Sequence, residues 1–138
     1  EALAVTINSH KKQIWNTFGF AIHNWKRVDV SSIYRTSAVQ FKIKADSIPK
    51  LSSTIRCYSG KTRAIHKILS KSNYSKIKEG HYNVCIPFKS FANFKKLNWN
   101  ALKEIRFKVL ENSNFEIGDF KIIEFRGNPE KPNQWRGI

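Results

Sequence analysis

The chain has 138 residues, of which 41% are hydrophobic and 13% aromatic, so it is large and apolar enough to bury a core and is not a disordered protein. Its 25 Lys and Arg against 10 Asp and Glu give a net charge of +15, which favours a polyanionic partner over a neutral one. No apolar run reaches the roughly 20 residues of a membrane-spanning helix.

Alternation of apolar and polar side chains with a period of two is the main structural pattern, and it predicts half-buried strands. In residues 38–45, for example, Val39, Phe41 and Ile43 share one face. In chain order, the expected strands cover residues 3–8, 13–25, 38–45, 53–58, 63–69, 82–86, 102–109 and 117–125. Pro87 cannot donate to a ladder and should end the sixth of them. The one helical candidate is short, residues 90–96.

Turn signals rich in Gly, Pro, Asn and Ser separate these segments at the spacing of a β-sandwich. We therefore predict an all-β fold, a two-sheet antiparallel sandwich of the jelly-roll type, and not a βαβ fold. Residues 1–127 would form the module, and residues 128–138 a linker or terminal extension. The first residues lack the pattern of a signal peptide, so we expect a mature or excised fragment.

Four segments, in this order, resemble the galactose-binding-like jelly rolls, a superfamily that includes many carbohydrate-binding modules. They are Asn24-Trp-Lys-Arg-Val-Asp-Val-Ser-Ser-Ile-Tyr34 with the strand after it, Gly80-His-Tyr-Asn-Val-Cys-Ile-Pro-Phe-Lys-Ser-Phe91, Trp99-Asn-Ala-Leu-Lys-Glu-Ile-Arg-Phe107 and Phe115-Glu-Ile-Gly-Asp-Phe-Lys-Ile122. The resemblance implies that a sugar binds on a concave face or at loop tips. It also implies a structural Ca²⁺ in many relatives, with Asp119 as one ligand. The chain offers few other carboxylates near its start, so no cofactor is required and calcium is an option only.

The segment from Ser47 to Lys78 contains no acid and eight Lys or Arg, interleaved with aromatic residues. Anionic sugars require such cations, and Arg matches carboxylate or sulfate with two bonds. If Ile55 and Cys57 point inward, the polar residues between them face outward. The predicted ligand-binding residues here are Arg56, Tyr58, Lys61, Arg63, His66 and Lys67. The alternative is a solvated strand face with no ligand.

Two further pairs are candidates for sugar contacts. Trp25 and Arg27 lie in an expected loop before a strand, where Trp25 would serve as a platform or as rim packing. Tyr74 and Lys76 lie in an expected basic loop and would be secondary contacts. Trp15 and Trp99 are assigned to the core, and Trp135 to the tail. Cys57 and Cys85 either pair or remain buried thiols.

Enzyme signatures are absent from the sequence. The four histidines show no HExxH spacing, the six glycines form no phosphate-binding loop, and the carboxylates form no recognisable glycosidase pair. A small polysaccharide lyase is a minor alternative. A single-stranded nucleic-acid binder also fits a basic, aromatic surface, but no RRM, KH or zinc-finger signature supports it. An assembly module would not need this charge.

The sequence thus predicts a non-catalytic, secreted carbohydrate-binding module whose ligand is an anionic polysaccharide, sulfated or built of uronic acids. Its other partner would be a linked catalytic or surface-anchoring domain in the parent chain, with neither membrane insertion nor nucleic acid. The sequence leaves open the identity of the polysaccharide and the binding face.

Overall fold

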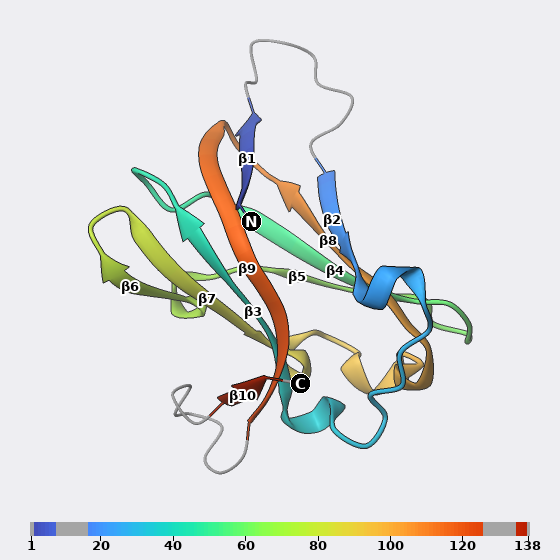
Figure 1. Cartoon of the computed structure of the whole chain (residues 1–138). Coiled ribbons are helices and arrows are strands. Elements are labelled where there is room, and N and C mark those ends of the chain that lie inside the picture. Colours follow the sequence, from blue (N-terminus) through green and yellow to red (C-terminus); the bar gives the residue numbers. More distant parts are fainter. Residues whose placement is uncertain (1, 8–16, 126–134, 138) are drawn as a thin grey trace.

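Two antiparallel β-sheets pack face to face in the computed structural model, which describes residues 2–7, 17–125 and 135–137 (Figure 1). Sheet A has the strand order β1-β9-β3-β7-β6, with β10 paired to β9 as its sixth strand. Sheet B has the order β2-β8-β4-β5. The predicted two-sheet antiparallel sandwich is confirmed.

The edge strands are shorter than the central strands of each sheet. Their bounds are β1 (Ala2–Ile7), β2 (Thr17–Ala21), β3 (Ser37–Lys44), β4 (Leu51–Cys57), β5 (Ala64–Ile68), β6 (Tyr74–Lys78), β7 (His81–Pro87), β8 (Leu102–Val109), β9 (Ser113–Phe125) and β10 (Trp135–Gly137). Helical structure in the described residues consists of short 3₁₀ turns in the connections: η1 (Ile22–Trp25), η2 (Tyr34–Thr36), η3 (Lys71–Asn73), η4 (Phe88–Ser90), η5 (Phe94–Lys96) and η6 (Trp99–Ala101). Within the described part of the chain, no helix is long and apolar enough to cross a membrane.

The core lies between the sheets and follows the predicted alternation. Phe41 of β3 and Phe107 of β8 are fully buried, with ring centroids 4.9 Å apart, so the two sheets meet through aromatic packing. Trp99 is buried as predicted, stacked between Tyr34 and Phe88 at centroid distances of 5.0 and 4.8 Å. The prediction for Trp15 lies outside the described residues.

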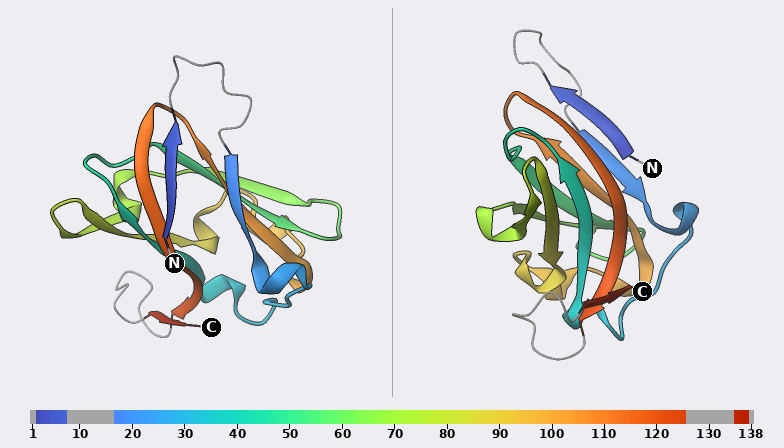
Figure 2. Two further views of the ribbon diagram at one scale, coloured as in Figure 1. Left: turned by 45° about the horizontal axis from the view of Figure 1, so that its top comes forward. Right: turned by 60° about the vertical axis from the view of Figure 1, so that its left-hand side comes forward.

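β9 is the longest strand and organises sheet A. β1 pairs with its first half and β10 with its end, while β3 follows its other side (Figure 2). The pairing with β3 shifts between Gln40 and Lys42, where Asp119 adopts a positive φ of 52°. This bulge turns Phe120 toward the core, where its ring stacks on Phe20 at 4.4 Å.

Two local predictions differ from the structure. Residues 74–78 form the edge strand β6 rather than a loop, because they pair with β7; Tyr74 packs inward while the rest of the strand is exposed. The expected helix over residues 90–96 is two separate 3₁₀ turns, η4 and η5. Within the expected terminal extension, residues 135–137 pair with β9 as a strand, and residues 128–134 lie outside the described chain.

Candidate functional site

The outer face of sheet B carries a polar, cationic surface made by its four strands. Ile55 and Cys57 are buried, so the residues of β4 that alternate with them face outward, as predicted. Register pairs Thr54 with His66 of β5 on one side and with Arg106 of β8 on the other. A pocket of about 440 Å³ results, lined by Thr17, Ser52, Thr54, Arg56, Ala64, His66, Arg106, Phe107 and Lys108.

A buried carboxylate holds two arginines on this face. Glu104 of β8 has a side chain only 4% exposed, and its Oε1 lies 3.3 Å from Arg56 Nη1 and 2.9 Å from Arg106 Nη2. Both arginine side chains remain partly open to solvent, at 34% and 44%. Each guanidinium has five N–H donors and uses few of them in its contact with Glu104, so donors remain available to a ligand.

A second contact, between Thr54 and His66, fixes the side chains next to the two arginines on this face. Thr54 Oγ1 lies 2.7 Å from His66 Nδ1, which ties β4 to β5 on the outer face. Lys108 is the third permanent cation of the pocket, and no carboxylate lines it. The described residues therefore present a net positive surface with fixed donors, suited to carboxylate or sulfate groups.

The other predicted residues of this segment do not join the pocket. Lys61 and Arg63 are exposed in the connection from β4 to β5, where Arg63 Nε donates to the carbonyl of Gly60 at 3.4 Å. Lys67 pairs with the buried Ser53 in the ladder, so alternation places it on the inner side of the edge strand.

Tyr58, Trp25 and Arg27 come together beyond the end of β4, although Tyr58 and Trp25 are 33 residues apart. The Tyr58 hydroxyl donates to the carbonyl of Trp25. Arg27 Cζ lies 5.8 Å and Lys103 Nζ 5.3 Å from the centre of the Tyr58 ring. The Trp25 side chain is 55% exposed, which leaves an aromatic surface available to a sugar ring.

Tyr74 and Lys76, the secondary contacts of the prediction, lie apart from this cluster on β6. Tyr74 packs against the core and its hydroxyl donates to the Pro49 carbonyl at 3.1 Å. Burial raises the pKa of Tyr74 well above its ordinary value. Lys76 Nζ pairs with Glu79 at 2.6 Å, and that carboxylate raises the pKa of the lysine.

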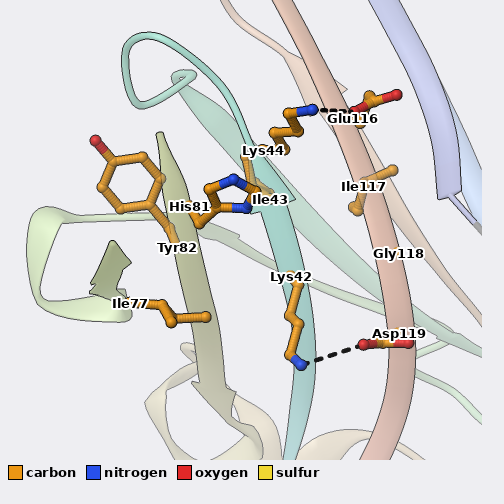
Figure 3. Close-up of a pocket in the computed structure, with 10 residues that line it drawn as sticks. All are labelled: Lys42, Ile43, Lys44, Ile77, His81, Tyr82, Glu116, Ile117, Gly118 and Asp119. Atoms are coloured by element: carbon orange, nitrogen blue, oxygen red, sulfur yellow. Dashed lines mark ion pairs between the residues drawn. The ribbon is translucent and has the colours of Figure 1, made fainter. Parts of the chain in front are cut away.

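A shallow groove of about 360 Å³ lies on the outer face of the opposite sheet, sheet A (Figure 3). Its two lysines are paired: Lys42 Nζ lies 3.3 Å from Asp119 and Lys44 Nζ 3.8 Å from Glu116. His81 lies beside Lys44 in this view. The groove is thus nearly balanced in charge, unlike the pocket on sheet B.

Asp119, the calcium ligand implied by the resemblance, faces the Lys42 ammonium rather than other oxygen ligands. Among the described residues, no group of three or more His, Cys, Asp or Glu could hold a metal ion. A hard cation such as Ca²⁺ takes six to eight oxygen ligands, and a calcium site at Asp119 stays a prediction.

Sequence reasoning missed Glu104, Arg106 and Lys108 as members of the site. The alternation of β8 marks all three as outward-facing, but only the pairing of β8 with β4 brings them beside Arg56. The structure leaves both cysteines as free thiols, one on each sheet. Burial raises the pKa of Cys85 to about 11.

Comparison with known proteins places this fold. A family 30 carbohydrate-binding module of a cellulosomal cellulase of Clostridium thermocellum superposes with a TM-score of 0.61 at 17% identity, over 80% of this chain and 68% of that one. A second crystal structure of a family 30 module gives a TM-score of 0.66 at 17% identity, over 96% and 74%. No curated protein matches the chain.

The model of the family "Carbohydrate binding domain 30" matches residues 1–124, nearly all of the sequence. The predicted class of protein, a binding module rather than an enzyme, is therefore confirmed. The chain belongs to carbohydrate-binding domain family 30 and is a carbohydrate-binding module.

Proposed function

We propose that this module binds an anionic polysaccharide, sulfated or built of uronic acids, along the outer face of sheet B. The observation that carries the proposal is the pair of arginines, Arg56 and Arg106, held by one buried carboxylate with donors left over for a ligand. Lys108 adds a third cation to the same pocket. A carboxylate or sulfate group would bridge these side chains, and Thr54 and His66 would bond to sugar hydroxyls.

The composition of the pocket supports an anionic ligand over a neutral one. Phe107, the only ring in its lining besides His66, is fully buried and offers no stacking face. Hydrogen-bond donors and positively charged side chains dominate the lining of this pocket. Binding of the polysaccharide would therefore be mainly electrostatic, and its affinity would fall at higher salt. Trp25, beyond the end of β4, would supply an exposed tryptophan face.

A neutral β-glucan is the second candidate ligand. One similar structure is a module of a cellulosomal cellulase, and Trp25 gives this chain an aromatic surface for a neutral sugar. The same similarity supports an extracellular location and a catalytic or anchoring domain in the parent chain, with residues 1–127 as the binding module. Tethering would raise the local concentration of that partner domain at the polysaccharide.

Affinity electrophoresis tests the proposal with three polymers: alginate, carrageenan and neutral hydroxyethylcellulose. We expect retardation by at least one of the two anionic polymers and not by the neutral one. Arg106→Ala should weaken binding by about tenfold to a hundredfold, since a charge-assisted bond is worth about 1.5–3 kcal/mol. Lys42→Ala, which removes the same charge from the opposite sheet, is the matched control and should bind nearly as the parent does. Equal losses in both variants, or retardation by hydroxyethylcellulose alone, would contradict the proposal.

A further inference from the structure

A separate pocket of about 600 Å³ lies at the open edge of the sandwich, between the segment after β2 and the middle of β9. Most of its lining is apolar: Ala21, Ile22, Val28, Val30, Phe120 and Ile122. Three charged residues complete it, Arg27, Asp29 and Lys121. None of these residues lines the pocket on sheet B.

The pocket exists because β9 is longer than the strands that pair with it. β1 pairs with residues 113–118 and β10 with residues 123–125, so among the described strands none pairs with residues 119–122 on the side away from β3 (Figure 1). Alternate backbone N–H and C=O groups along an unpaired edge point outward and can bond to a ligand. The bulge at Asp119 also turns Phe120 toward the adjoining core.

The charged side chains of this pocket are positioned to contact a ligand. Ser31 donates to the Asp29 carboxylate from its backbone N–H at 2.9 Å and from its hydroxyl at 2.6 Å, and these bonds lower the pKa of Asp29. Asp29 is therefore an ionised acceptor in a fixed position. Arg27 and Lys121 make no ion pair with the described residues, and the Arg27 guanidinium lies over the Tyr58 ring, so both charges remain available to an anionic group.

We infer that this pocket is a second sugar site, which takes one anionic sugar residue. An apolar ring face would lie on Val28 and Phe120, the carboxylate or sulfate would bond to Arg27 and Lys121, and Asp29 would accept from a hydroxyl. The volume falls within the range of about 300–1,000 Å³ of small-molecule pockets. The identity of the ligand rests on the proposed function, whereas the location does not.

The test uses two monosaccharides that differ by one group, glucuronate and glucose, titrated into the isotope-labelled module and followed by amide chemical shifts. We expect glucuronate to shift the signals of Val28, Lys121 and Ile122, and glucose to shift them far less. Lys121→Ala, a change at an exposed residue, should weaken glucuronate binding about tenfold. Lys108→Ala, the control on sheet B, should leave this binding unchanged while it weakens binding of the polymer.

The outcomes separate the two proposals. Shifts centred on Thr54 and His66 instead, equal shifts with glucose, or unchanged affinity in Lys121→Ala would overturn the second site. If the polymer still binds in an Arg106-dependent way in that event, the proposed function stands. If neither the anionic polymers nor glucuronate binds, the anionic ligand is wrong for both sites.

Discussion

Arg106 Nη2 lies 2.9 Å from Oε1 of Glu104, a carboxylate that is almost completely buried on the outer face of sheet B. The same oxygen also lies 3.3 Å from Arg56, so one acid orders two arginines from adjacent strands. An acid here reduces the positive charge of the face, yet it also fixes where the remaining donors point. These two effects predict opposite results when the carboxylate is neutralised.

Glu104→Gln should weaken binding of the anionic polysaccharide about threefold to tenfold, although the loss of the carboxylate makes the net charge one unit more positive. The physical reason is that Arg56 and Arg106 would lose their common partner and with it their fixed position. Calorimetric titration of the polymer into the variant measures the effect. The free energy of unfolding should fall by only about 1 kcal/mol, because both arginines can turn to solvent when they lose this partner.

Glu116→Gln on sheet A is the matched control, since Glu116 pairs with Lys44 far from the pocket. It should change binding little, apart from a small general gain from the added charge. Stronger binding in Glu104→Gln than in this control would show that Glu104 acts only through its charge.

The β-sandwich could be predicted because its pattern is visible within single strands. In β3, β4 and β8 the alternation of apolar and polar residues marks one buried face on each strand. The side chains next to Arg56 could not be predicted from the sequence, because the β4–β8 ladder joins residues that are 48 positions apart, as in the Arg56–Glu104 pair. Tyr74 was misplaced since β6 is a short, mostly exposed edge strand with little alternation. The finer assignment to galactose-binding-like jelly rolls stays a prediction.

Trp25→Ala should weaken binding of the polysaccharide about threefold to tenfold while the melting temperature changes little, because the side chain is 55% exposed. Tyr58→Phe removes only the hydroxyl that donates to the Trp25 carbonyl. This second variant should lose about 1 kcal/mol of stability and less affinity than Trp25→Ala. Thermal unfolding and affinity electrophoresis on both proteins give the comparison. A reversed order of the two affinities would assign the contact to Tyr58 instead.

Ser53→Ala should stabilise the fold by about 1 kcal/mol, because Ser53 Oγ is buried between the sheets with no hydrogen-bond partner among the described residues. Ser37→Ala is the matched control: that hydroxyl is also buried, but it donates to the Ile33 carbonyl at 2.7 Å. The control should destabilise by about 1 kcal/mol. Chemical denaturation of both variants measures the difference, and a loss of stability in Ser53→Ala would mean that its hydroxyl has a partner, such as a buried water.

The Cys85 thiol should titrate near pH 11, because burial raises its pKa from 9.0 to about 11. Below about pH 9 the thiol is protonated in both the folded and the unfolded chain, so this group has no effect on stability there. Between about pH 9 and 11 only the unfolded chain ionises, and the free energy of unfolding should therefore fall as pH rises. Other groups titrate in this range, so the measurement is the difference between the parent and Cys85→Ala in denaturation at pH 8 and pH 10.5. The parent should lose more stability than the variant over this interval, and equal losses would mean that the folded thiol ionises at its ordinary pH. Thiolate absorbance in a Cys57→Ser background, which leaves Cys85 as the one thiol, gives the pKa directly.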